Sequence, residues 1–159
     1  MSSDKVSTDI NPDIGAVLSS ARTFLMHEHS LFKSLNLEPL LIGKGKATFA
    51  VDLPEAFSDN AGYIHGGLYT TIMDSIFGMT VFTALEKVQP IATINLRSDY
   101  LQKVEPGTRA VCAAECTEIV NNIAYVYGDL QSKTSGQRLA FGSGTFMVGT
   151  RSAAKGSRI

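Results

Sequence analysis

The longest hydrophobic pattern in the chain lies between residues 62 and 86 and has helical spacing. Apolar side chains recur every three or four positions after the glycine pair Gly66-Gly67 and cover much of the helix circumference, which predicts a helix buried on more than one side. Asp74 is the only residue between Gly66 and Leu85 that is charged at pH 7. A buried carboxylate is costly unless it is paired, hydrogen-bonded or in a wet cleft, so Asp74 is the first candidate for function.

Before this helix, the pattern predicts one further helix and then strands. Asn11 is suited to cap a helix whose first turn holds Pro12, and the apolar spacing continues to about His29. From Phe32 to Leu53 the pattern is strand-like, with glycines at a turn near residues 43–45. Residues 46–53 alternate, which places on one face Ala47, Phe49, Val51 and Leu53.

After Glu86 the chain reads almost entirely as β-structure, with strands predicted at 91–101, 109–119, 123–132 and 138–148. In the first of these, alternation predicts an inward face of Ala92, Ile94, Leu96 and Tyr100, and an opposite face of Thr93, Asn95, Arg97 and Asp99. Because successive strands with short turns pair antiparallel, we expect an α+β fold in which an antiparallel sheet wraps around the long helix.

Length and composition fit one globular domain. The chain has 159 residues, of which 44% are hydrophobic and 18% charged. We expect the domain to span 13–149, between a flexible N-terminal tail (1–12) and a flexible basic C-terminal tail (150–159). A net charge of −1 provides no basic field, so nucleic acid is not an expected partner.

The polar N-terminus shows no secretory signal, and the two cysteines favour a reducing, cytoplasmic location. Cys112 and Cys116 on one strand would lie ~13 Å apart, too far for a disulfide. The long helix is not an expected membrane span, because it contains Asp74 and several hydroxyl residues and lacks flanking basic clusters. His27 and His29 point in different directions on a helix, so no metal site is predicted.

One motif points to a family. Gly62, the run His65-Gly66-Gly67, and Asp74 after six further residues resemble the signature of hotdog-fold acyl-CoA thioesterases, specifically the branch similar to phenylacetic acid thioesterases (PaaI-like). The resemblance covers roughly residues 30 to 148. An asparagine usually lies six positions before the histidine in this family, but Asp59 stands there and Asn60 follows. Either the loop bulges and Asn60 serves, or Asp59 takes the role, or the role is lost; we expect Asn60.

The resemblance implies hydrolysis of an acyl- or aryl-acyl-CoA to free acid and CoA, with no metal and no cofactor besides the CoA of the substrate. The Gly66 amide is suited to stabilise the oxyanion because it opens a helix. Asp74 would act as general base or as nucleophile. His65 and Asn60 complete the implied catalytic set. The implied substrate-binding residues are Gly67, Thr93 and Tyr63.

Asp74 follows Gly66 by eight positions, which is ~12 Å along one helix, too far for both to reach one thioester carbon. The resemblance resolves this by pairing subunits, so that Asp74 of one faces Gly66 of the other. We therefore expect a homodimer or a dimer of dimers (a homotetramer). The cations considered for the CoA phosphates are Arg97, Arg151, Lys155 and Arg158, although each alone fits an ordinary solvated charge.

Other interpretations stay open at this point. Asp74 fits a structural carboxylate bonded to backbone or to a threonine, the glycine pair fits a tight turn or close packing, and aromatic residues at helical spacing fit a core. Two other functions remain: a non-catalytic acyl-CoA-binding hotdog protein, and an enoyl-thioester hydratase or dehydratase that uses His65 with Asp74.

Overall fold

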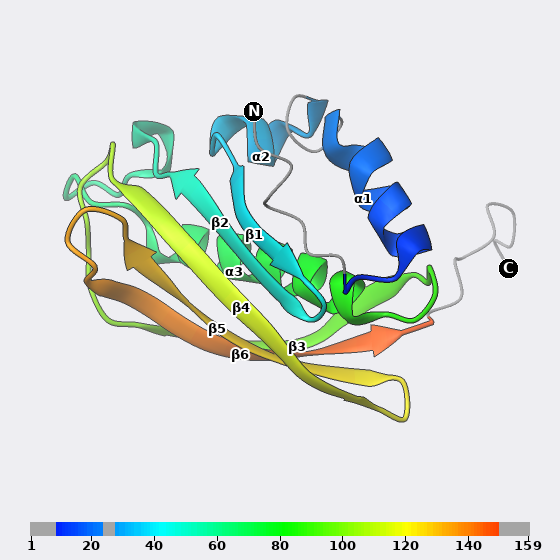
Figure 1. The fold of residues 1–159 in the computed structure, drawn as a ribbon. Helices are drawn as coiled ribbons and strands as arrows, with labels where there is room; N and C mark the ends of the chain where they lie inside the picture. Colours follow the sequence, from blue (N-terminus) through cyan, green and yellow to red (C-terminus); the bar gives the residue numbers. More distant parts are fainter. Residues whose placement is uncertain (1–8, 24–27, 150–159) are drawn as a thin grey trace, which may run out of the picture.

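An antiparallel six-stranded sheet curls around one long helix, α3 (Gly66–Ala84), in the computed structural model, which describes residues 9–23 and 28–149 (Figure 1). The strands are β1 (Glu38–Gly43), β2 (Lys46–Asp52), β3 (Ile91–Tyr100), β4 (Arg109–Val120), β5 (Ile123–Ser132) and β6 (Arg138–Val148). The predicted α+β fold, with a sheet around a central helix, is confirmed.

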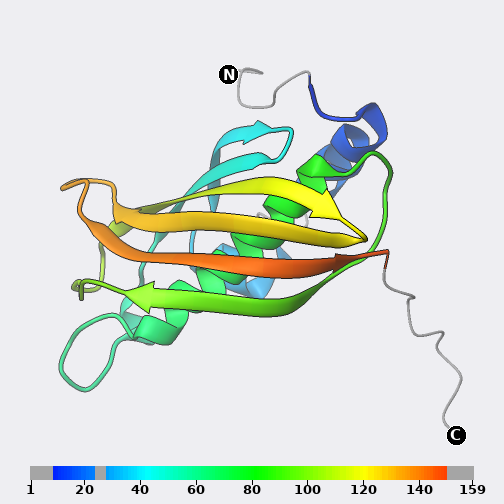
Figure 2. The same ribbon diagram turned by 90° about the horizontal axis from the view of Figure 1, so that it is seen from below.

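The strand order is β1-β2-β4-β5-β6-β3, so one expected pairing is wrong. β3 does not pair with β4, its successor in the chain, but with β6, and it forms an edge of the sheet (Figure 2). The segment between β3 and β4 crosses to the other side of α3. It is held there by backbone hydrogen bonds from Ile64 to Val104 and from Leu53 to Thr108.

The N-terminal part differs from its prediction. Asn11 caps α1 (Pro12–Thr23) as expected, because its Oδ1 accepts the backbone N–H of Asp13 at 2.9 Å. The structure describes this helix as far as Thr23, and residues 24–27, over which it was predicted to continue, lie outside the described residues. His29 has an extended backbone and precedes a separate short helix, α2 (Ser30–Ser34). Phe32, predicted to be in a strand, lies in α2; it is buried with Leu35, and this burial holds α2 against the core.

The predicted tails fall largely outside the described residues, at 1–8 and 150–159. Ile10, which lies within the predicted N-terminal tail, is only 7% exposed and belongs to the hydrophobic core. Ile10 is therefore part of the folded domain, and the other domain boundaries stay predictions. No helix within the part of the chain that the structure describes has both the length and the hydrophobicity to cross a membrane.

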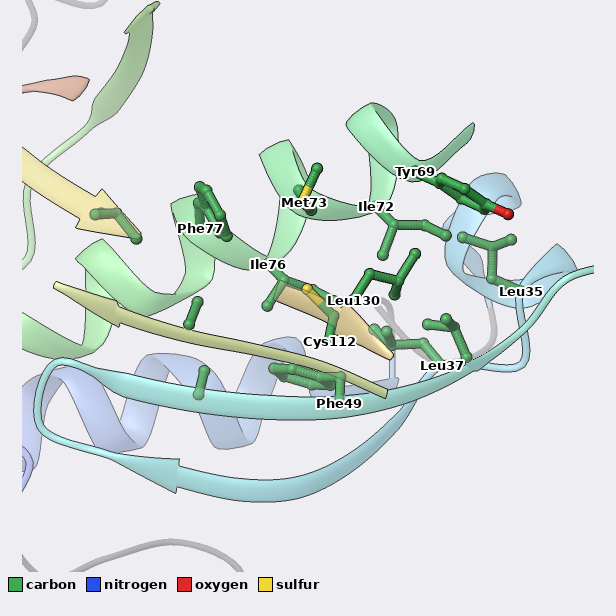
Figure 3. Close-up of a cluster of buried hydrophobic side chains, with 14 of the residues drawn as sticks. Leu35, Leu37, Phe49, Tyr69, Ile72, Met73, Ile76, Phe77, Cys112 and Leu130 are labelled. Carbon is green, nitrogen blue, oxygen red and sulfur yellow. The ribbon is translucent and has the colours of Figure 1, made fainter. Parts of the chain in front are cut away.

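The core lies between α3 and the concave face of the sheet (Figure 3). The helix contributes Tyr69, Ile72, Met73, Ile76 and Phe77, all at most 2% exposed. These side chains pack opposite residues of the sheet and of the segment before it, among them Leu35, Leu37, Phe49, Cys112 and Leu130. Each such side chain stabilises the fold by roughly 1.5–3 kcal/mol through burial. The predicted inward face of β2, which includes Ala47 and Val51, is confirmed.

The predicted faces of β3 are wrong in its first half. The register against β6 shifts between Thr93 and Asn95, so Ile94 is the extra residue of a β-bulge. A bulge reverses the alternation beyond it. Ile94 is consequently 52% exposed rather than inward, whereas Thr93 contacts α3. Beyond the bulge, Leu96 packs against the core as predicted, and Tyr100 lies on the α3 side, where it contacts the helix but stays 54% exposed.

A charged cluster joins β1, β2 and β4 at one end of the sheet. The Arg109 guanidinium binds Asp52 at 2.5 Å and Glu38 at 2.7 Å, and Asn36 Nδ2 donates to Asp52 at 2.9 Å. Burial raises the pKa of Asp52, but the hydrogen bonds from Asn36 and Arg109 outweigh it, so this pKa lies below its ordinary value.

Asp52 should therefore make stability depend on pH. Its pKa is lower in the folded than in the unfolded protein, so the ionised carboxylate stabilises the fold above the unfolded pKa, and this contribution is lost as pH falls through the folded pKa. We expect Asp52→Asn to lower the free energy of unfolding by about 1 kcal/mol near neutral pH, allowing for solvent screening, and to have little effect at about pH 2–3. Urea unfolding at both pH values measures this. The exposed Glu118→Gln is the control; an Asp52→Asn effect independent of pH would contradict the prediction.

Candidate active site

The loop before α3 is organised by Asp59. Its Oδ1 accepts the backbone N–H groups of Ala61 at 2.9 Å and Tyr63 at 3.0 Å, and the Tyr63 bond is the main reason that the pKa of Asp59 is lowered. Gly62 closes the turn with a φ of +82°, which favours glycine. Asn60 is exposed, and its side chain makes no hydrogen bond within the described residues. Asp59 thus shapes the loop, while a role for Asn60 stays a prediction.

His65 and the two glycines form the entry to α3. His65 is the N-cap, and its Nδ1 accepts the Gly67 N–H at 3.0 Å, so the proton of the neutral imidazole lies on Nε2. No acceptor for the Gly66 N–H is found in residues 9–23 and 28–149. This donor, at the positive end of a 19-residue helix, is available to a ligand oxygen.

The ring of Tyr100 covers Gly66. A β-carbon at Gly66 would lie 3.0 Å from Cε2 of Tyr100, so only glycine fits here without displacing the ring. The Tyr100 hydroxyl is 2.6 Å from Thr70 Oγ1, one helical turn after Gly66. Sequence reasoning placed Tyr100 on the inner face of its strand but did not link it with Gly66. No local signal could have done so, because the two residues are distant in the chain.

Two turns into α3, Asp74 meets Thr93. Thr93 Oγ1 donates to Asp74 Oδ1 at 2.9 Å, and Asp74 is partly exposed on the helix. The bulge at Ile94 turns Thr93 toward α3, and alternation alone predicted the opposite. The structure thus brings Thr93, which the family resemblance implied as a substrate-binding residue, to Asp74.

Within one chain, the predicted residues fall into two groups. The first contains His65, Gly66 and Gly67, and the second contains Asp74 and Thr93; they are ~12 Å apart along the axis of α3. Tyr63 lies in the loop before the first group, is 38% exposed, and has the Lys103 ammonium 5.6 Å from its ring centroid.

Of the cations considered for the CoA phosphates, Arg97 forms an ion pair with Asp99 at 3.0 Å, and Arg151, Lys155 and Arg158 lie outside the described residues. In the described ranges, no cluster of three His, Cys, Asp or Glu side chains is arranged for a metal ion, and His27 lies outside them. Both cysteines are free thiols, and burial raises the pKa of each.

The comparison with protein families matches the segment that carries this geometry. The model of the family described as "Thioesterase superfamily" matches residues 61–138, from the loop before α3 to the start of β6. The match covers 78 of the 159 residues and identifies this segment as similar to the thioesterase superfamily. The prediction of a thioester hydrolase is confirmed at this level.

Curated relatives align over much of the chain. Acyl-coenzyme A thioesterase 13 from Mus musculus is 28% identical over 95 residues, which are 60% of this chain and 67% of that protein. Its counterpart from Homo sapiens is 26% identical over 105 residues, 66% of this chain and 74% of that protein.

Solved structures confirm the hotdog fold. A variant of the phenylacetic acid degradation protein PaaI from Thermus thermophilus aligns with a TM-score of 0.67 and 24% identity, over 75% of this chain and 98% of its own. A hypothetical thioesterase with coenzyme A from Streptococcus pneumoniae aligns with a TM-score of 0.67 and 20% identity, over 76% of this chain and 92% of its own.

Proposed function

We propose that this protein is an acyl-CoA thioesterase that hydrolyses acyl- or aryl-acyl-CoA to the free acid and CoA. The observation that carries the proposal is the Asp74 carboxylate, held by Thr93 on a helix whose other side is buried in the core. The relatives named acyl-coenzyme A thioesterase 13, and the Streptococcus pneumoniae thioesterase described with coenzyme A, support CoA as the carrier.

In the proposed reaction, water attacks the thioester carbon and the carbon–sulfur bond breaks. The Gly66 N–H stabilises the oxyanion, a contribution typically worth about 10²–10³ in rate. Asp74 takes the proton of the attacking water and returns it to the departing thiolate, or it attacks the carbon itself and forms an anhydride that water then opens. Thr93 orients the carboxylate, and His65 presents Nε2–H to the substrate while holding the helix entry.

The distance between the two groups supports a site shared by two subunits. Gly66 and Asp74 each lie four positions from Thr70. Two α3 helices packed antiparallel about a two-fold axis near Thr70 would therefore bring Asp74 of one subunit beside Gly66 of the partner subunit, twice per dimer.

Two surface features support this dimer. Gly67, Thr71, Ser75 and Gly78 are small and only partly covered, so they leave space for a second helix along the stripe that contains Asp74. Beside the stripe, β3 is a ten-residue edge strand, and unpaired edges readily add a strand from another chain. A dimer of dimers is supported by exposed aromatic side chains on the outer face of the sheet, namely Tyr125, Tyr127 and Phe141.

Hydrolysis of a thioester panel tests the proposed function. With acetyl-, hexanoyl-, phenylacetyl- and crotonyl-CoA, we expect release of free thiol with a kcat on the order of 1–10 s⁻¹ for the preferred ester. A hydratase would instead consume the enoyl absorbance of crotonyl-CoA without releasing thiol. A binding protein would bind the esters, measured by calorimetry, without turnover. Either result would refute the thioesterase proposal.

A further inference from the structure

A pocket of about 320 Å³ opens beside the first turn of α3, between that helix and α2. Its apolar walls are Leu31, Phe57 and Leu68, and its polar positions are Ser58, His65 and Thr71. A cavity of ~150 Å³ holds a benzene molecule, so this pocket has room for one aromatic ring or a medium-length alkyl chain. Apolar walls with a few polar groups are typical of small-molecule sites.

The pocket adjoins the proposed oxyanion donor. His65 and Gly67, which both line it, flank Gly66 in the chain, and the His65 ring lies against Gly67. A thioester whose carbonyl oxygen accepts the Gly66 N–H thus has one of its two arms within reach of the pocket. The apolar walls favour the acyl arm over the pantetheine arm, because the amides of pantetheine need several hydrogen-bonding partners.

The wall that α2 contributes is held in place. Phe32 and Leu35 are only 7% and 1% exposed. The Leu35 N–H donates to the Leu31 carbonyl at 3.0 Å, which closes one helical turn. Leu31 itself is partly buried against the core. Its side chain therefore lines the pocket from an element held against the core, although it belongs to a segment outside the residues 61–138 that match the superfamily.

One residue of the pocket lining has an unmatched polar atom. The Ser58 Oγ is buried and has no hydrogen-bond partner among the described residues. Buried hydroxyl groups are nearly always hydrogen-bonded, and because solvent in the open pocket does not reach this oxygen, a buried water is its simplest partner. Ser58 lies opposite Ile64 in the isolated bridge that closes the loop before α3, which places its hydroxyl in the same loop as the proposed substrate contacts.

We propose that this pocket receives the acyl group of the thioester and that Leu31 of α2 limits the length of the chain that fits. This inference rests on the proposed function, because it assigns a place to the group that is hydrolysed. Leu31 acts here as a specificity-determining residue, since it sets the depth of the pocket and takes no part in the chemistry.

Substitution of Leu31 tests whether this residue sets the depth of the pocket. We expect Leu31→Trp to lower the ratio of kcat/KM for octanoyl-CoA to kcat/KM for acetyl-CoA at least ~10-fold, because a lost methylene contact alone changes discrimination by about 10–200-fold. Leu31→Ala should shift the preferred chain length upward. Lys33→Trp adds an equal bulk to the exposed side of α2 and should leave the profile unchanged. A Leu31→Trp loss that is equal for all chain lengths would overturn the proposal.

A binding experiment separates this inference from the proposed function. The chain contains no tryptophan, so Phe57→Trp places a single fluorophore in the pocket wall and Lys33→Trp places one outside it. S-octyl-CoA, a thioether that cannot be hydrolysed, should shift the emission of Phe57→Trp and leave that of Lys33→Trp unchanged, whereas S-ethyl-CoA should have a smaller effect. A shift without thioester turnover would refute the enzyme proposal and keep the pocket. Turnover or calorimetric binding without a shift would refute the pocket.

Discussion

Replacing Asp74 with asparagine is expected to lower kcat/KM for the preferred acyl-CoA by about 10³-fold, within the range typical for loss of a general base. The amide has almost the same shape and still accepts the Thr93 hydrogen bond, but it neither takes a proton nor forms an anhydride. Fold and oligomeric state should persist, because Asp74 makes its described side-chain hydrogen bond only with Thr93. Thiol release measures the rate, and sedimentation and circular dichroism measure assembly and fold.

Matched variants show whether the effect belongs to this position. Asp99→Asn makes the same chemical change at a carboxylate that pairs with Arg97 and lines a hollow with outer-face residues such as Tyr127, and it should retain the wild-type rate. Thr93→Val should lose less activity than Asp74→Asn, because Thr93 positions the carboxylate without contacting the reacting atoms, and Thr93→Ser should restore most of that loss. Wild-type turnover by Asp74→Asn would remove Asp74 from the mechanism.

Mixing two inactive variants is expected to restore activity. In a dimer of Asp74→Asn with Gly66→Val, one shared site would combine the intact Asp74 of the second chain with the intact Gly66 of the first, and the other site would carry both changes. Random exchange of subunits makes half of the dimers mixed, so the mixture should reach about one quarter of wild-type activity. Valine is chosen at Gly66 because even a β-carbon meets the Tyr100 ring at 3.0 Å.

The contact with Tyr100 means that a side chain at Gly66 also meets the ring, in addition to its effect on access to the amide. Gly66→Val should also be combined with Tyr100→Ala in one chain, because loss of the Tyr100 ring leaves space for the valine side chain. Native mass spectrometry must show that mixed dimers form. If they form and the mixture stays inactive, each site lies within one subunit, and the shared-site proposal is wrong.

The two interpretations of Asp74 that the sequence left open are now easier to separate. A structural carboxylate was expected to bond to backbone, as Asp59 does in the loop, or to a threonine, and the Thr93 bond fits the second form. What favours function is that Asp74 stays partly exposed on a stripe of small residues and accepts only this one described side-chain hydrogen bond. This arrangement supports a carboxylate that is kept accessible to a ligand, and the Asp74→Asn experiment decides the matter.

The elements of this fold were largely predictable because each depends on a local pattern. Helical spacing predicted α3, alternation predicted β2, the strand pattern after Glu86 predicted β3 to β6, and Asn11 with Pro12 marked the start of α1. The cluster of His65 and Gly66 with Asp74 was equally visible, since the spacing of a motif is a property of the chain and needs no tertiary contact.

Tertiary packing decided the features that turn this pattern into a site. The bulge at Ile94 brings Thr93 to Asp74, and the pairing of β3 with β6 lays Tyr100 over Gly66. Phe32 lies in α2 rather than in the predicted strand, and its burial holds this helix in a position that places Leu31 beside the pocket. Periodicity predicts which side chains are buried. Long-range strand pairing and the packing of other segments decide which residues those side chains contact. For that reason the residues proposed for the chemistry could be named from the sequence, whereas their arrangement in space was visible only in the fold.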